Sequence, residues 1–204
     1  MRRIGIYGGS FAPPHNGHVR AARAFLDAME LDLLMIVPSA RPPHKQLSDG
    51  ASEADRLTMT RLAFAGMERA VVSDVEMVRG GVSYTADTLR SLAREDRELY
   101  LLVGTDMLLT LDTWYKPEVI FRLAHICYVR RECDAALTER IKETVRRYER
   151  DFHARVHEIP VDVLTLSSTE VRDGRVSAEA VPPSVLQYMT ERGLYGYGRR
   201  TDRA

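Results

Sequence analysis

The amino-acid sequence predicts an α/β protein, in which a doubly wound parallel β-sheet carries helices on both faces. Short apolar segments typical of strands alternate with segments whose apolar residues recur at helical spacing. The segment 31–37 is apolar almost throughout, as expected for a strand that helices cover on both faces. A glycine-rich turn follows the first apolar segment, at the strand end where open α/β sheets bind ligands.

Periodicity and turn residues place each element. We expect strands at 3–7, 31–37, 71–72, 99–103, 126–129 and 156–159. We expect helices at 16–29, 53–65, 83–92, 105–111, 117–123 and 137–148, one that begins at Ser168, and a last one from Pro183 to a C-cap at Gly193. In the helix at 53–65, Leu57, Leu62 and Ala65 are predicted to share the buried side.

Length and composition indicate one globular domain. The 204 residues suit a single domain at 1–195, followed by a polar tail at 196–204. Lys and Arg number 29, and Asp and Glu also number 29. The resulting net charge of zero argues against nucleic acid or a membrane surface as a partner held by bulk charge. The sequence leaves open whether the chain forms a homo-oligomer.

The sequence also predicts a cytoplasmic location. The longest interior apolar run, 33–37, is far shorter than the roughly 20 residues that cross a bilayer. No long apolar region follows Arg2 and Arg3, so we expect no signal peptide. The two cysteines, Cys127 and Cys133, form no C-x-x-C pair, which argues against a zinc or thioredoxin-type motif. A chain of this length with only two cysteines suggests a reducing compartment.

The stretch YGGSFAPPHNGH, residues 7–18, combines groups suited to phosphate. Its glycines let backbone N–H groups approach a ligand, and the helix that follows has an N-terminus that favours anions. His15 and His18 allow three interpretations: a capped helix start, a metal pair, or hydrogen-bond donors to phosphate oxygens. A metal site lacks a third ligand at suitable spacing. Phosphate binding is favoured because Ser10 lies in the same turn, although the pattern is neither G-x-G-x-x-G nor a Walker loop.

Several stretches resemble one enzyme family. The turn GGSFAPPHNGH resembles the (T/S)xxHxGH signature of the nucleotidyltransferase superfamily, and LSSTEVR at 166–172 resembles its second motif, (I/V)SSTxxR. The bacterial nicotinate mononucleotide adenylyltransferases have stretches similar to PPHK (42–45), SYTADTL (83–89), LVGTDMLLTLDTWYKPEVI (102–120), AHICYVRR (124–131) and GLY (193–195). These matches run in order from residue 4 to residue 195 and imply a Rossmann-like nucleotidyltransferase fold. Family members commonly have Asp where this chain has Ala12, a position that we interpret as shaping the turn.

The resemblance implies adenylyl transfer from ATP to nicotinate mononucleotide, which gives nicotinate adenine dinucleotide and pyrophosphate in NAD biosynthesis. Both reactants are anions, so such an enzyme acts through positioning and electrostatic stabilisation. By resemblance, His18 stabilises the α-phosphate in the transition state and His15 the neighbouring phosphates. A protonated histidine donates from either ring nitrogen. Mg²⁺ would bridge the ATP phosphates and be held by substrate oxygens and water, with no metal site made by the protein.

ATP is expected to meet two parts of the chain. By resemblance, the ATP-binding residues are Gly8, Gly9, Ser10, His15, His18, Ser167, Ser168, Thr169 and Arg172. Ser167 and Glu170 also form a capping-box pattern, which serves to begin a helix. The two interpretations are compatible, because a capped helix N-terminus still attracts phosphate.

The mononucleotide is expected to meet residues that follow other strands. By resemblance, Trp114 stacks on the pyridine ring, Thr85 and Tyr115 lie near the ring carboxylate, and Asp106 contacts the ribose or ring side. His44, Lys45 and Arg131 are expected to bind the same substrate, the first two at its phosphate. Five of these residues also have a structural interpretation: a core aromatic for Trp114, a helix-start carboxylate for Asp106, and solvated side chains for His44, Lys45 and Arg131.

Two other functions are weighed against this one. A phosphopantetheine adenylyltransferase would share the first and last motifs, but not the Trp114–Tyr115 loop or the SYT element. A non-catalytic nucleotide-binding module would share the fold, and the intact His15, His18 and Arg172 argue against it. The absence of the dinucleotide fingerprint argues against an oxidoreductase.

Overall fold

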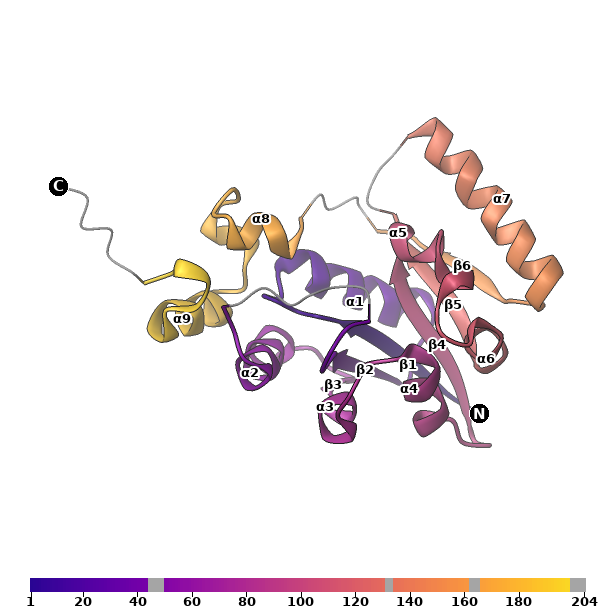
Figure 1. Ribbon diagram of the computed structural model, residues 1–204, viewed down its shortest axis with the longest axis horizontal. Coiled ribbons are helices and arrows are strands. Elements are labelled where there is room, and N and C mark those ends of the chain that lie inside the picture. The colour runs from indigo at the N-terminus through magenta and orange to yellow at the C-terminus, as the bar shows by residue number, and fades with distance from the viewer. Residues whose placement is uncertain (44–49, 131–133, 162–165, 199–204) are drawn as a thin grey trace.

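The computed structural model describes residues 1–43, 50–130, 134–161 and 166–198. Within these residues, six strands form one sheet in the order β3-β2-β1-β4-β5-β6, and all neighbouring strands are parallel (Figure 1). The strands are β1 (Arg2–Gly9), β2 (Leu33–Pro38), β3 (Ala70–Val72), β4 (Arg97–Gly104), β5 (Ala124–Val129) and β6 (Val156–Ile159). The parallel sheet confirms the predicted fold class.

The helices follow the predicted order with two differences. They are α1 (Asn16–Ala28), α2 (Glu53–Phe64), α3 (Val75–Arg79), α4 (Thr85–Leu92), α5 (Thr105–Leu108), α6 (Pro117–Leu123), α7 (Ala135–Phe152), α8 (Ser168–Arg172) and α9 (Pro183–Arg192), with 3₁₀ turns η1 (Leu111–Thr113), η2 (Ala178–Ala180) and η3 (Leu194–Gly196). The sequence analysis missed α3, because a helix of little more than one turn shows no periodicity. The helix expected at 105–111 is divided into α5 and η1.

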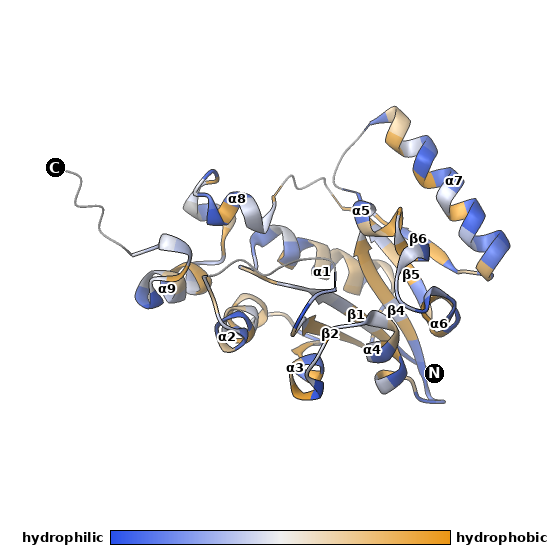
Figure 2. Cartoon of the chain, viewed as in Figure 1, coloured by the Kyte–Doolittle hydropathy of each residue, from blue (hydrophilic) through white to orange (hydrophobic). Residues whose placement is uncertain are grey.

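Two hydrophobic clusters cover the two faces of the sheet. One face packs against α1 and α2, through residues that include Phe25 and Phe64. The other packs against α4, α6 and α7, through residues that include Leu89, Phe121 and Tyr148. Figure 2 shows hydrophobic residues concentrated on the strands and hydrophilic residues along much of α7. The sheet is therefore doubly wound, as predicted.

The buried side of α2 differs from the prediction. Leu57 and Leu62 are only half-buried and Ala65 is exposed, whereas Arg56 and Met59 are fully buried. Met59 belongs to a third cluster that joins α2 to the C-terminal helices. The inward direction of Arg56 has a specific cause, since its guanidinium binds two loops beneath the candidate site, as described below.

The C-terminal helices pack on the side of α2. Gly193 ends α9 in the left-handed conformation expected of a C-cap, with φ of 63°. The described beginning of the predicted tail takes part in this packing, because the Tyr197 hydroxyl donates to the Val171 carbonyl at 2.9 Å. No helix in the described part of the chain is both long enough and apolar enough to cross a membrane.

Candidate active site

A cavity of about 220 Å³ lies at the carboxyl ends of β1 and β4. These neighbouring strands mark the point where the strand order reverses, which is where open α/β sheets bind their ligands. Of the predicted site residues, the cavity lining brings together Gly8, Gly9, Ser10, Thr85, Trp114 and Tyr115. The glycine turn and the tryptophan loop, about a hundred residues apart in the sequence, therefore share one cavity.

The turn after β1 is fixed by a buried aromatic ring. Phe11 is 1% exposed and contacts Tyr7 and Phe64 edge to face, with centroids 5.5 and 6.1 Å apart. Its φ of 45° is rare for an aromatic residue, so the surrounding packing holds it there. A Cβ on Gly9 would lie 3.1 Å from the Phe11 ring, which explains the glycine at this position. The packed ring anchors a turn whose backbone lines the cavity.

His15 and His18 lie one turn apart at the start of α1. The backbone N–H of His15, the N-cap residue, donates to Nδ1 of His18 at 3.1 Å. While Nδ1 accepts this bond it carries no proton, so His18 donates from Nε2 alone. Nε2 is therefore the nitrogen left to donate in this arrangement, and donation to phosphate stays a prediction. The bond from the His15 N–H also fixes the orientation of the ring before any ligand binds.

Gly17 makes room for the first histidine. A Cβ on Gly17 would lie 2.8 Å from Nδ1 of His15, so any other residue here would force the His15 ring to shift. The His15 ring is 4% exposed and its centroid lies 3.7 Å from that of His18. The helix-capping interpretation of His15 is confirmed, and contact of the pair with phosphate stays a prediction.

α8 docks on the same turn from the other end of the chain. The Ser168 hydroxyl donates to the Pro13 carbonyl at 2.9 Å. Arg172 donates from Nη1 to the Ala12 carbonyl at 2.6 Å and from Nη2 to the Thr169 hydroxyl at 3.0 Å. The structure thus brings these three residues of the second motif beside the histidine turn. Arg172 binds the turn through a backbone carbonyl, so this contact does not depend on the side chain at position 12, and the interpretation that residue 12 shapes the turn stays a prediction.

The capping box predicted at Ser167 is present. Its hydroxyl accepts from the backbone N–H of Glu170 at 3.2 Å, and its own N–H donates to a carboxylate oxygen of Glu170 at 2.9 Å. The bond from the Ser167 hydroxyl lowers the pKa of Glu170. The structural interpretation of this serine is therefore confirmed, and its contact with ATP stays a prediction.

Arg56 is a functional residue that the sequence analysis missed. It is 1% exposed, and its guanidinium donates to the Ser10 carbonyl at 2.9 Å and to the Ala40 carbonyl at 3.1 Å. Burial lowers the pKa of this group below its ordinary value. Ser10 lies in the turn after β1 and Ala40 in the loop after β2, so one side chain joins two loops whose residues line the cavity. No local pattern marks it, because both partners lie far away in the sequence.

The SYT element forms another part of the cavity wall. Ser83 is buried, and its hydroxyl accepts from the Ala40 N–H at 2.9 Å, so it holds the same loop after β2. Tyr84 is the N-cap residue of α4, and its ring centroid lies 4.3 Å from that of Tyr115. Lys116 places its ammonium 4.8 Å from the Tyr115 ring centroid, a cation–π contact. This wall therefore combines two aromatic rings in contact, and a positive charge lies next to one of them.

Glu76 is a second lining residue that the sequence analysis missed. It is 7% exposed, and its carboxylate accepts from the Thr88 hydroxyl at 2.6 Å. Both terminal nitrogens of Arg79 donate to the same hydroxyl at 3.2 Å. Thr88 therefore fastens α4 to α3 and holds the helix start at Thr85 against the cavity. Periodicity did not reveal Glu76, because a helix as short as α3 shows no apolar face in the sequence.

The other predicted residues are placed as follows. Asp106 is exposed in the first turn of α5, and its neighbour Met107 lines the cavity. His44, Lys45 and Arg131 lie outside the described residues. Among the residues that the structure describes, no three or more His, Cys, Asp or Glu side chains form a group that could hold a metal ion.

Comparisons with known proteins identify the family. The cytidylyltransferase-like family model matches residues 6–174. A protein from Synechococcus sp. named "Probable nicotinate-nucleotide adenylyltransferase" is 40% identical over 201 residues, which cover 96% of this chain and 95% of that one. A protein of the same name from Neisseria meningitidis is 37% identical over 199 residues, with 96% and 99% covered.

A solved structure has the same fold. The nicotinic acid mononucleotide adenylyltransferase of Plasmodium falciparum, complexed with NaAD, superposes with a TM-score of 0.75 at 16% identity, over 97% of this chain and 98% of that one. At this identity the likeness speaks for the fold alone, while the two bacterial relatives carry the family assignment. The chain belongs to the cytidylyltransferase-like family and, within it, to the nicotinate-nucleotide adenylyltransferases.

Proposed function

We infer that the protein transfers the adenylyl group of ATP to nicotinate mononucleotide and releases pyrophosphate, in NAD biosynthesis. The observation that carries this inference is the single cavity shared by the glycine turn and the Trp114–Tyr115 loop. The turn offers backbone N–H groups and Ser10 for phosphate, and the loop offers a flat ring for a pyridine. One cavity thus combines a surface suited to phosphate with a surface suited to a pyridine ring.

In this reaction, a phosphate oxygen of the mononucleotide attacks the α-phosphorus of ATP. A new P–O bond forms as the bond to the bridging oxygen breaks, and pyrophosphate leaves with the electron pair. Because the attacking phosphate is already ionised, the protein needs no strong base. His18, oriented through its Nδ1, presents Nε2–H to the charge that develops on the transferring phosphoryl group. His15 and Arg172 are proposed to contact the other phosphates.

The divalent cation that the ATP phosphates carry is proposed to be Mg²⁺. The described residues do not supply a cluster of acidic or imidazole ligands for it, and Ala12 contributes no carboxylate to the turn. A hard cation of this kind prefers oxygen ligands and is suited to coordination by phosphate oxygens and water. In this proposal, the residues of the protein position the phosphates, and the phosphates coordinate the ion.

The pyridine ring is assigned to the wall formed by Trp114, Tyr115 and Thr85. Stacking on Trp114 would fix the plane of the ring. The start of α4 at Thr85 and the Lys116 ammonium near Tyr115 would favour a ring that carries a carboxylate. His44, Lys45 and Arg131 belong to the same proposal as contacts of the mononucleotide.

The test is pyrophosphate release from ATP with three acceptors side by side: nicotinate mononucleotide, nicotinamide mononucleotide and phosphopantetheine. We expect turnover with the first, weaker turnover with the second and none with the third. Turnover with phosphopantetheine alone would overturn the substrate assignment. Absence of pyrophosphate with every acceptor would favour a non-catalytic nucleotide-binding protein.

A further inference from the structure

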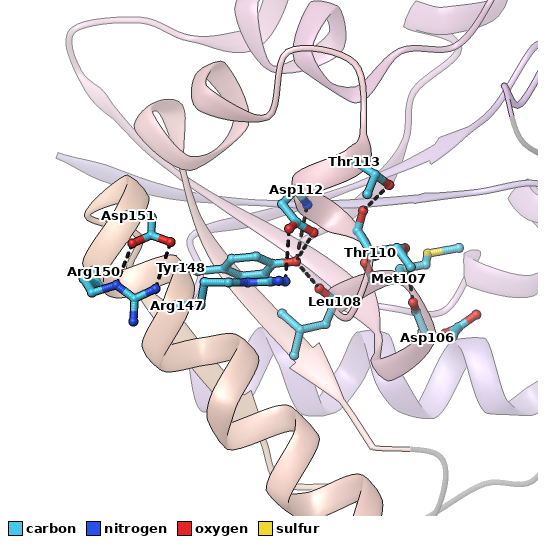
Figure 3. A network of polar contacts seen from close by, with 10 residues as sticks. All are labelled: Asp106, Met107, Leu108, Thr110, Asp112, Thr113, Arg147, Tyr148, Arg150 and Asp151. Carbon is cyan, nitrogen blue, oxygen red and sulfur yellow. Dashed lines mark hydrogen bonds and ion pairs between the residues drawn. The ribbon is translucent and has the colours of Figure 1, made fainter.

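The loop that carries Trp114 is held by α7, a helix none of whose residues lines the cavity. Tyr148 projects from α7 toward Leu108 and Asp112, as Figure 3 shows. Its hydroxyl lies 2.8 Å from the Leu108 carbonyl and 2.9 Å from a carboxylate oxygen of Asp112, so its one proton is shared between these two acceptors, and it accepts from the Asp112 N–H at 3.3 Å. A single buried hydroxyl therefore contacts the loop at two places.

A second contact comes from the same helix. Arg147 forms an ion pair with the other carboxylate oxygen of Asp112, at 3.0 Å (Figure 3). The Arg147 guanidinium also lies 5.3 Å from the Tyr148 ring centroid. Both oxygens of Asp112 are thus bound by neighbouring residues of α7. Arg147 is 42% exposed, so the Tyr148 hydroxyl, which is fully buried, is the stronger of the two attachments.

The two attachment points stand on either side of the loop. Leu108 is the last residue of α5, directly after Met107, which lines the cavity. Asp112 is the middle residue of η1, and Trp114 is the C-cap of that turn, with its N–H donating to the Leu111 carbonyl at 3.2 Å. The Tyr148 hydroxyl therefore fixes the spacing between two cavity-lining residues, Met107 and Trp114.

We propose that Tyr148 is a positioning residue for the acceptor nucleotide, and that it acts by holding Trp114 in the orientation in which the indole stacks on the pyridine ring. The proposal rests on the proposed function for the identity of that ring. Burial raises the pKa of the Tyr148 hydroxyl, so the group stays protonated and donates at neutral pH. Nothing in the proposal requires Tyr148 to touch a substrate.

The chain offers a matched pair of variants. Tyr148→Phe removes the hydroxyl, while its ring keeps the contact with Phe121 at 4.8 Å. Tyr128→Phe is the control, because Tyr128 is also buried and donates to Glu158 at 2.7 Å, away from the Trp114 loop. We expect Tyr148→Phe to raise the KM for nicotinate mononucleotide by about tenfold and to leave the KM for ATP unchanged. Tyr128→Phe should change neither constant.

Fluorescence gives a readout that does not depend on turnover. Trp114 is the only tryptophan, so its emission and its quenching by acrylamide report this loop alone, without substrate. Tyr148→Phe should increase acrylamide quenching of Trp114, and Tyr128→Phe should not. If the wild-type enzyme fails to use nicotinate mononucleotide, the proposed function falls, yet the quenching comparison still tests whether Tyr148 holds Trp114.

Asp112→Ala tests the same contacts from the half-exposed side of the loop. It removes both carboxylate contacts and leaves the core intact, so it serves if Tyr148→Phe does not fold. We expect the same selective rise in the KM for the mononucleotide. The proposal is overturned if both variants match the wild type in KM and in quenching, or if they raise the two KM values by the same factor.

Discussion

Arg56 offers the most direct test of how the candidate site is built. Its guanidinium joins the turn after β1 to the loop after β2 through two backbone carbonyls, and it is 1% exposed. Replacement by methionine keeps most of the side-chain volume and removes both donors. The Ser10 and Ala40 carbonyls would then lose their hydrogen-bond donor, and burial limits the access of water that could replace it.

The expected loss in the free energy of unfolding follows from the two hydrogen bonds. A hydrogen bond from a charged donor contributes about 1.5–3 kcal/mol, so the pair contributes about 3–6 kcal/mol before other effects. Methionine avoids the cost of desolvating a guanidinium, which offsets part of this loss. We expect Arg56→Met to reduce the free energy of unfolding by about 2–4 kcal/mol. In a chain of this size, that loss lowers the Tm by about 4–16 °C.

The assay combines thermal unfolding with pyrophosphate release. Both loops line the cavity, so kcat/KM should fall by about tenfold or more for ATP and for the mononucleotide. Arg61→Met is the control: it removes the same charge from the same helix, where Arg61 is 56% exposed and pairs with Asp74 at 3.6 Å. That variant should lose at most about 1 kcal/mol. If Arg56→Met and Arg61→Met have the same free energy of unfolding and the same kcat/KM, the two carbonyl contacts do not hold the site.

Three further predictions concern histidines and the second motif. His18→Ala should lower kcat by about 10²–10³ while the protein stays folded, as expected for loss of one preorganised donor, and unimpaired turnover would contradict the role. Arg172→Ala should raise the KM for ATP; if KM and kcat both stay unchanged, the residue only holds the Ala12 carbonyl. Burial and the nearby Arg155 lower the pKa values of His125 and His157, so both bind a proton less readily in the folded state than in the unfolded chain. The unfolded chain therefore binds more protons below about pH 6.5, and stability should fall as the pH drops through that value. Chemical denaturation at pH 7.5 and 5.5 should show a smaller pH effect in His157→Gln, and an equal effect would refute the assignment.

The sequence predicted the fold well because each element carries its own pattern. α6 and β6 have the predicted bounds, and the other predicted strands differ at their ends by a few residues. The prediction failed on the buried side of α2, where apolar Leu57 and Leu62 gave way to Arg56. A charged side chain is buried where it finds hydrogen-bond partners. Partners that lie far away in the sequence do not alter local periodicity.

The motifs of the candidate site were predictable from the sequence, but the residues that hold these motifs in place were not. Trp114 and the glycine turn are recognisable in sequence, and the structure brings them to one cavity. The residues that hold them, Arg56, Thr88 and Tyr148, bind groups on other elements. Their roles follow from tertiary contacts, which one sequence does not display.

The departure from the family pattern at residue 12 has an explanation in these contacts. Ala12 is 4% exposed, and the bond from Arg172 reaches its backbone carbonyl, an atom that alanine and aspartate share. Ser168 likewise holds the next residue, Pro13, through its carbonyl. The turn is held through its backbone from both α2 and α8, and these contacts do not depend on the side chain at position 12. The histidines that follow can therefore keep their place at the start of α1 although the aspartate is missing.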